Sequence, residues 1–543
     1  RECIPGEINN TVTGECTPCE ATTYSFNSLD KTCTRCPDGA ICHGGAKIQV
    51  REGYWRRNST SAQIIPCEGD YTRCIGGFDE YCREDRTGPV CLQCNFEDDY
   101  LAQNNGECSQ CSDQGYLFGV GTVMLIVITI FQVFSLYTAF SSSKKAFLER
   151  TVSLSASSTK KPLSEGKEPV PGPYLEIFTT YSQMTSIFSE MVGGFLNRVF
   201  DVPATVGNPN QKIFFSLQCL LYLLTEDQLE ILKYKTIIFV LSPLLKILIY
   251  LLVELTRGLI KRDFKKKELS VRIGAVTIGL ISLEQPQIIG ILCNYLACIR
   301  LDPTDDALYV AANPNVQCGT YEYNLFRYYF VLPSLMAWGF LVPLALILIL
   351  AKKKTRLMES KSLFVVFGKL YDNYTPEAYF WGLVVILFKI SMFVANSLLK
   401  PYNLGRGIVL IIIVHCYFTM YKRFNPHPHK DLARADFYTI RVFMWTILFV
   451  LLIDQLDTPW VHTVCAVFIV MTNAIVICYL GLRLAVVYKK TFAPVIEKVK
   501  RRLSRGKTNG SEAVKEDGVQ GTFFEGLKPN ETNKTLFGYN ACI

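Results

Sequence analysis

An apolar stretch at residues 116–140 constrains this chain most strongly. It holds 25 consecutive residues without a single charged side chain. A helix needs roughly 20 apolar residues to cross the hydrocarbon core of a bilayer. The stretch therefore predicts a first transmembrane helix, with a cysteine-rich segment before it and further hydrophobic blocks after it.

The net charge of +8 is positive enough to raise the question of nucleic acid. The basic residues cluster beside the hydrophobic blocks, however, which is typical of membrane topology. No nucleic-acid partner is therefore expected.

The segment at residues 1–114 is crowded with cysteine and holds 13 of the 21 cysteines of the chain. A spacing of paired C-x2-C motifs thirteen residues apart occurs twice and suits either zinc or disulfides. A Gly- and Asn-rich extracellular segment with little apolar core needs disulfides, which favours disulfides over metal. The cysteines predicted to pair are Cys3, Cys16, Cys19, Cys33, Cys36, Cys42, Cys67, Cys74, Cys82, Cys91, Cys94, Cys108 and Cys111.

Thirteen is an odd number, so one of these cysteines is expected to be free or to pair upstream of Arg1 or in another chain. A start at Arg1 fits either a processed chain or part of a longer ectodomain. Two glycosylation sequons, at Asn9 and Asn58, support an extracellular location. The sequon at Asn373 falls in a predicted cytoplasmic loop and is expected to stay unglycosylated.

Residues 16–42, CTPCEATTYSFNSLDKTCTRCPDGAIC, resemble an ephrin-receptor-like cysteine-rich repeat. GYWR at 53–56 and the run of residues 74–94 resemble the juxtamembrane module of large polytopic surface proteins of unicellular eukaryotes. The resemblance implies a TRP-like bundle of helices in the membrane, and many members carry long ectodomains upstream.

The same resemblance continues at residues 367–393, in a tyrosine-rich loop followed by Pro-Glu and an aromatic pair. The matching positions are Tyr371, Tyr374, Pro376, Glu377, Tyr379, Trp381 and Lys389. The family usually has Glu after the Trp and Arg-Lys in the next helix, whereas this chain has Gly382 and Phe388-Lys389. The roles of those two missing charges do not carry over to this chain.

Eight further spans are predicted after the first, so the fold class is an all-α membrane protein of about nine helices beneath a small disulfide-rich module. The predicted spans cover residues 174–199, 234–255, 273–297, 325–351, 380–399, 405–421, 438–454 and 461–487. Residues 141–173 form a Ser/Lys/Pro linker, and residues 174–487 form the helical membrane domain. The apolar residues 213–224 are too few to span and are expected to be interfacial or re-entrant.

The loops between these spans differ sharply in charge. The four loops assigned to the cytoplasm hold 23 Lys and Arg residues, and the four outer loops hold 4. By the positive-inside rule this predicts an extracellular N-terminus and a cytoplasmic C-terminus at the plasma membrane or another surface membrane, such as that of a cilium. Cys298 and Cys318 then share an outer loop and are predicted to pair.

The tail at residues 488–543 is basic and predicted to be largely disordered. Its juxtamembrane cations attract anionic lipid of the inner leaflet at about 1 kcal/mol each. The cations predicted to contact lipid are Lys489, Lys490, Lys498, Lys500, Arg501 and Arg502.

Four ionisable residues fall well inside predicted helices: Glu190, Lys246, Glu284 and Lys389. A charge in hydrocarbon costs roughly 2.5–3.5 kcal/mol on insertion scales, so such residues pair or line water. One interpretation is a set of ion pairs, Glu284 with Lys246 or Lys389. The other is a hydrophilic pathway for ions. Pro286, in the polar break 284–287, predicts a kink whose freed carbonyls need partners.

The sequence shows none of the familiar catalytic or nucleotide-binding motifs, so neither enzymatic activity nor a cofactor is predicted. His427 and His429 are too few to predict a metal site and are expected in a solvated loop.

Two functions fit these features. The first is a receptor or channel-like protein whose ectodomain acts on the bundle; the second is an adhesion protein that anchors an extracellular assembly. The expected partners are an extracellular protein or upstream ectodomain and a homo-oligomeric or other membrane complex. A charge-lined path inside the bundle would favour the first function, and sealed ion pairs the second.

Overall fold

The computed structural model describes most of the chain. The described residues are 2–9, 15–67, 71–79, 81–102, 108–111, 171–192, 196, 199–200, 203–204, 217–222, 224–225, 227–261, 266–302, 305–353, 360–456 and 458–508. The predicted first span and residues 141–170 of the predicted linker lie outside this part, whereas residues 171–173 belong to the first described α-helix. Contacts divide the chain into two units, residues 1–487 and 488–543.

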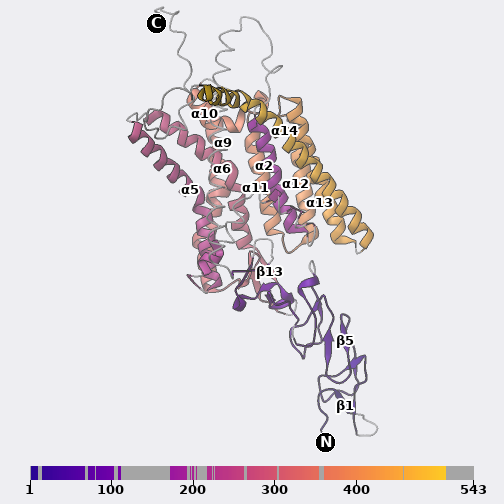
Figure 1. Ribbon diagram of the computed structural model, residues 1–543. Helices are drawn as coiled ribbons and strands as arrows, with labels where there is room; N and C mark the ends of the chain where they lie inside the picture. Colours follow the sequence, from indigo (N-terminus) through magenta and orange to yellow (C-terminus); the bar gives the residue numbers. More distant parts are fainter. Residues whose placement is uncertain are drawn as a thin grey trace, which may run out of the picture. The chain divides into compact units, whose positions relative to one another are not determined.

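The N-terminal module consists of short antiparallel hairpins (Figure 1). Disulfides cross-link these hairpins. Successive strands pair in the order β1 (Glu7–Asn9) with β2 (Cys16–Pro18), β3 (Thr23–Tyr24) with β4 (Thr34–Arg35), β5 (Ala40–Cys42) with β6 (Ile48–Val50), β7 (Tyr54–Trp55) with β8 (Ile65–Pro66), β9 (Arg86–Thr87) with β10 (Gln93–Cys94), and β11 (Tyr100–Ala102) with β12 (Cys108–Gln110). Six disulfides lie within the module: Cys3–Cys16, Cys19–Cys33, Cys36–Cys42, Cys67–Cys74, Cys82–Cys91 and Cys94–Cys108. Hairpins this short bury little apolar surface, so the cross-links supply the stability that a larger core supplies elsewhere.

Arg56, in the GYWR stretch, lies in the core of the module. It is buried and donates hydrogen bonds to the hydroxyl of Tyr81 (2.7 Å) and the carbonyl of Phe78 (2.9 Å). The neighbouring Trp55 is buried as well. These side chains stabilise the module.

The membrane domain is a bundle of long helices (Figure 1). Its elements are α2 (Pro171–Met191), α5 (Gln228–Lys261), α6 (Lys266–Leu296), α7 (Tyr321–Phe326), α8 (Leu332–Met336), α9 (Val342–Lys353), α10 (Lys361–Tyr371), α11 (Trp381–Leu398), α12 (Asn403–Phe424), α13 (Lys430–Gln455) and α14 (Pro459–Thr508). Seven described helices are long and apolar enough to cross a membrane, and α7 to α9 count as one of them. The predicted class, a multi-pass helical membrane protein under a disulfide-rich module, is confirmed.

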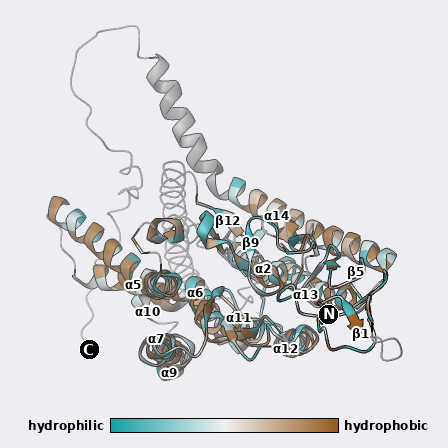
Figure 2. Cartoon of the chain, turned by 90° about the horizontal axis from the view of Figure 1, so that it is seen from below, coloured by the Kyte–Doolittle hydropathy of each residue, from teal (hydrophilic) through white to brown (hydrophobic). Residues whose placement is uncertain are grey.

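The outward faces of several helices are apolar, as membrane helices require. Figure 2 shows hydrophobic residues along much of α5 and α14. Leu244, Leu248 and Leu252 on α5 are about half exposed, as are Val467 and Met471 on α14. These surfaces suit contact with lipid tails.

The helices α6 and α11 form the centre of the bundle. Of the apolar window of α6, 72% is buried, against 17% for the span Tyr321–Lys353. On one side α11 packs with α2, α12 and α13 around Trp381, and on the other α6 and α11 pack with α10 around Phe364. Polar residues on α6 are therefore held inside protein.

The span Tyr321–Lys353 contains two wide π-helical turns, η4 (Arg327–Val331) and η5 (Ala337–Leu341). Each turn ends two residues before a proline, Pro333 and Pro343. A proline in a helix clashes with the carbonyl four residues earlier, and a wider turn relieves that clash.

Most helices extend beyond the predicted spans. Helix α13 begins at Lys430, so part of the predicted loop 422–437 is helical. Helix α14 continues to Thr508, well past the predicted end of the last span at residue 487. Helix α6 remains helical through Pro286.

Candidate functional site

The polar interior of the bundle is organised by α2, which packs against α11 and α13. Glu176, Gln183 and Glu190 lie seven residues apart on this helix. Seven residues make nearly two full turns, so these three side chains share one face over about 20 Å of helix. Because α2 is packed inside protein, this face lines the interior of the bundle.

Lys246 and Glu284 form an ion pair between α5 and α6. Glu284 is 1% exposed and also accepts a hydrogen bond from Ser242 (3.2 Å), whereas Lys246 is 23% exposed. Of the two partners predicted for Glu284, the structure selects Lys246. The pair satisfies a buried charge that would otherwise be costly.

Lys389, the other predicted partner, lies elsewhere in the bundle. It is buried on α11, where the charged groups that act on it are Glu176 and Lys369. Among the described residues, no carboxylate lies within ion-pair distance of its ammonium group.

Two buried glutamines near Pro286 donate to backbone carbonyls of neighbouring helices. Gln183 donates to the carbonyl of Leu283 at 2.9 Å, and Gln285 donates to the carbonyl of Trp338. A proline weakens the hydrogen-bond ladder near it, so exposed carbonyls need outside donors. Gln183 thus links α2 to α6, and Gln285 links α6 to the span Tyr321–Lys353.

An outer cavity of about 70 Å³ lies among α2, α5, α6 and α11. Its charged lining residues are Glu190, Lys235 and Lys400. The amide nitrogen of Asn396 donates to the carboxylate of Glu190 at 2.8 Å, which fixes the orientation of both side chains. The predicted intramembrane residue Glu190 therefore belongs to a polar cavity.

An inner cavity of about 30 Å³ lies at the other end of α2, around Glu176. His427, 7% exposed, lines it and contacts the carboxylate of Asp436 at 2.9 Å. The prediction of a solvated His427 is therefore wrong: the start of α13 brings Asp436 over it. Burial, and then the charge of Glu176, raises the pKa of the neighbouring Tyr374 well above its usual range.

Asn373, the third sequon, lies beside this cavity. It donates to the carboxylate of Glu176 at 3.3 Å. A side chain held against α2 in this way fits the expectation that it carries no glycan.

At the end of the bundle that contacts the disulfide-rich module, the loop between α6 and α7 folds into a three-stranded sheet, which we call the cap: β13 (Cys298–Arg300), β14 (Leu308–Val310) and β15 (Asn313–Gln317). The disulfide Cys298–Cys318 closes it, as the sequence predicted. Val310 and Val316 are buried among apolar residues of α5 and α6. The cap is thus an extension of the bundle.

The disulfide-rich module is hydrogen-bonded to this cap. Asn315 accepts from the backbone N–H of Cys94 (3.1 Å) and donates to the carbonyl of Cys94 (2.8 Å). Gln93 donates to the carbonyl of Pro314 at 2.9 Å. These side-chain bonds join β10 to β15.

A charged contact adds to this junction. Arg57 of the module pairs with Asp302 (3.2 Å) and Asp305 (2.6 Å), which follow β13. Asp302 is buried, although Arg57 is about half exposed. The contact orients the module more than it stabilises it, because exposed ion pairs contribute only about 0–1 kcal/mol.

The odd cysteine of the module is Cys111, and its partner is Cys219. Cys219 lies in a helical turn at residues 217–222, inside the short apolar stretch 213–224. Phe96 packs edge-on against Tyr222, whose hydroxyl donates to Asp99 at 2.6 Å. The sequence expectations of a free thiol, or of a partner upstream or in another chain, are wrong: the partner is in the membrane domain.

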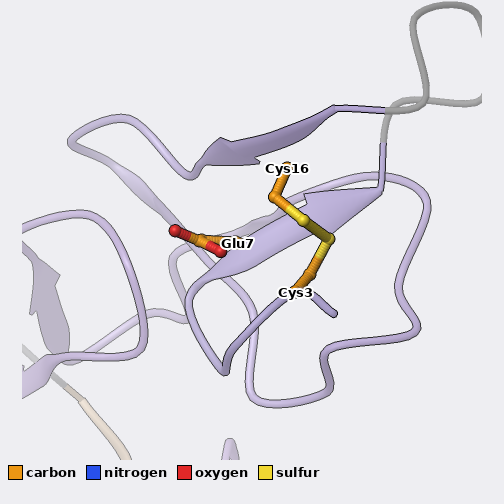
Figure 3. A group of neighbouring side chains, drawn as sticks. All are labelled: Cys3, Glu7 and Cys16. Carbon is orange, nitrogen blue, oxygen red and sulfur yellow. A yellow bond between two sulfur atoms is a disulfide. The ribbon is translucent and has the colours of Figure 1, made fainter. Parts of the chain in front are cut away.

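One group of described residues has the proximity of metal ligands, namely Cys3, Glu7 and Cys16. Figure 3 shows that the two sulfur atoms are bonded to each other. A metal takes thiolate ligands, and a disulfide offers none. This group is a cross-link beside a carboxylate.

The remaining predicted sites are on the surface. Asn58 is exposed and its side-chain oxygen accepts from the backbone and hydroxyl of Thr60, and Asn9 is exposed at the end of β1. Lys489 is exposed on α14, whereas the side chains of Lys490, Lys498, Lys500, Arg501 and Arg502 lie outside the described part. Glycosylation and lipid contact remain predictions.

No family of known proteins, no curated protein and no solved structure matches this chain. The resemblance to polytopic surface proteins therefore stays a prediction. The apolar helices and disulfides define a multi-pass membrane protein with an extracellular disulfide-rich module.

Proposed function

We propose that this protein is a cell-surface receptor of a channel-like type, in which the extracellular module acts on the polar interior of the helix bundle. The observation that carries the proposal is the junction between the module and the cap. A protein that only anchored its module would need one membrane helix and no such junction.

The junction reaches the bundle through β15. Pro314 and Asn315 bind the module, and the adjacent Asn313 donates to Gln228 at the start of α5 (3.0 Å). Since β15 is directly followed by α7, a displacement of the module would be transmitted to two membrane helices.

The polar face of α2 supports a conducting role. It connects an acidic residue in the outer cavity, Glu190, to one in the inner cavity, Glu176, through Gln183. Acidic side chains inside a bundle commonly mark cation or proton pathways. Gln183 and Gln285 are both buried and hydrogen-bonded to neighbouring helices, which fits a closed state.

Adhesion or anchoring is the second candidate, and the Lys246–Glu284 pair favours it. A buried pair of opposite charges with further hydrogen bonds is how a static bundle satisfies charge in hydrocarbon. The two functions therefore differ in whether the interior ever opens.

The test is to pull on the module while recording current. Cells expressing the full chain with an N-terminal affinity tag would carry magnetic beads, and whole-membrane current would be measured with and without force. We expect force to change the current, and the double variant Arg57→Gln/Asn315→Ala to lose most of the response at equal surface delivery.

The matched control is Asn324→Ala. Asn324 lies beside the cap and donates only to the carbonyl of Gly319 among the described contacts, so its loss leaves the junction intact. A surface-delivered wild-type chain that stays silent under force, stretch and voltage would refute the conducting role and leave the anchor.

A further inference from the structure

Three buried oxygen atoms of residues that line the outer cavity have no protein partner among the described residues. They are the side-chain oxygens of Asn294, Tyr295 and Asn396. Tyr295 and Asn396 are 1% and 2% exposed. Buried polar atoms are normally satisfied, so three together in one cavity point to something that binds there.

The orientation of Asn396 is fixed by its neighbour. Its nitrogen donates to Glu190, so its oxygen must point away from that carboxylate. An amide and a carboxylate held in this way present acceptors to a group that carries several N–H donors. An ammonium group has that chemistry, and the negative charge of Glu190 attracts it further.

The cavity also contains cations. Lys235 and Lys400 line it, on α5 and just after α11. Lys235 is held in place by Gln218, to which it donates at 2.9 Å, and Lys400 is partly exposed. Two ammonium groups disfavour an inorganic cation, and they suit a carboxylate.

Size limits the ligand further. One water molecule needs about 10–15 Å³ of cavity volume. The outer cavity, of about 70 Å³, therefore holds on the order of five water-sized groups. Apolar side chains, among them Phe239, Ile291 and Phe393, line the rest. A small molecule with opposite charges at its two ends matches these dimensions and this lining.

We infer that the outer cavity is a binding site for a small zwitterion of the α-amino acid class. Its ammonium group binds Glu190 and the oxygens of Asn294, Tyr295 and Asn396, and its carboxylate binds Lys235 and Lys400.

The site lies directly beneath the cap, since Ala312 lines the cavity. Ala312 immediately precedes Asn313, and Asn315 binds the module two residues further on. Binding itself does not depend on the proposed receptor function, but its consequence for the module rests on that function. The two are measured separately: ligand binding on purified protein, and force response in cells.

The test uses glycine as the probe, with methylammonium and acetate as its two halves. Binding of radiolabelled glycine to the purified full chain in detergent would be measured by equilibrium dialysis, beside the melting temperature. We expect saturable glycine binding and a larger thermal shift from glycine than from either half, because only glycine contacts both ends of the cavity.

Two variants locate the site. Lys400→Gln and Asn396→Leu are each expected to weaken glycine binding at least tenfold, and Lys353→Gln, an exposed lysine at the end of α9, is the matched control. Lys400 is partly exposed, so its variant is expected to fold normally.

Four outcomes would overturn the inference. They are no saturable glycine binding, a shift by acetate alone equal to that of glycine, an equal shift by methylammonium alone, and an unchanged affinity in Lys400→Gln. The second would define an anion site and the third a cation site.

Discussion

Asp85 shows how single charges stabilise the extracellular module. Both nitrogens of the Arg83 fork bind its carboxylate, at 2.5 and 2.8 Å. Burial alone would raise the pKa of Asp85, but the hydrogen bonds and charge of Arg83 outweigh it and lower the pKa below its ordinary value of 3.8.

The pH dependence of this contact follows from that shift. Because the pKa of Asp85 is lowered in the folded protein, the stabilisation is complete above pH 3.8, the ordinary pKa of the group. It is lost as the pH falls through the pKa of the folded state. We expect Asp85→Asn to lower the free energy of unfolding at neutral pH by less than about 1 kcal/mol, because Arg83 is half exposed. This loss should appear as a slightly lower melting temperature of the full chain. The difference should vanish in melts near pH 2. The exposed Asp79→Asn should show neither effect.

The Lys246–Glu284 pair allows a sharper test. Lys246→Met leaves an almost fully buried carboxylate, whereas Glu284→Gln leaves a partly exposed ammonium. Removing one partner of a buried pair typically costs about 3–5 kcal/mol. We expect Lys246→Met to lower the melting temperature more than Glu284→Gln, and the double variant Lys246→Met/Glu284→Leu to recover most of the loss. A double variant less stable than either single variant would contradict a structural pair.

At the scale of elements, α10 and α11 lie in close contact at Gly382. A Cβ atom there would lie 2.4 Å from the carbonyl oxygen of Leu370. Backbone cannot move aside as a flexible side chain does. A side chain at this position has no room, so the packing of α10 against α11 requires glycine here.

Gly382→Ala should therefore destabilise the bundle. The expected cost is about 1–3 kcal/mol, typical of overpacking, seen as a lower melting temperature in detergent. Gly481→Ala on α14 is the control: nothing lies within 4 Å of its Cβ position, and alanine favours helix by about 1 kcal/mol. Equal melting temperatures for both variants would show that α10 shifts to accept the methyl group.

At the scale of the whole molecule, the disulfide Cys111–Cys219 joins residues that are 108 positions apart. Closing so long a loop stabilises a fold by about 5 kcal/mol in the chain-entropy account. It also fixes the module to the membrane domain independently of the chain that runs between them.

Cleavage between the two cysteines tests this directly. With a protease site inserted after Lys160, the cut protein should run as one band on a non-reducing gel and as two after reduction. Cys219→Ser should give two bands in both gels, and Cys465→Ser, which removes a free cysteine, should behave as wild type. Two bands from the wild type without reductant would exclude the cross-link.

The sequence by itself determined the class of the protein. Apolar runs of sufficient length and a local excess of cysteine are properties of short segments. They can therefore be recognised in the sequence without knowledge of the fold. The disulfide Cys298–Cys318 was also predicted correctly, because both cysteines lie in the same short loop. The helix ends were less accurate, because apolar length marks where hydrocarbon ends and α13 and α14 continue into polar residues.

Only the tertiary structure decided how distant residues meet. The partner of Cys111, the choice of Lys246 for Glu284, the burial of His427 under Asp436 and the gathering of Glu190, Lys235 and Asn396 around one cavity all depend on helix packing. Each of these contacts could be formed by several residues of the same type. Composition and spacing cannot rank such alternatives, because the energy that selects one of them comes from the packing of the whole bundle.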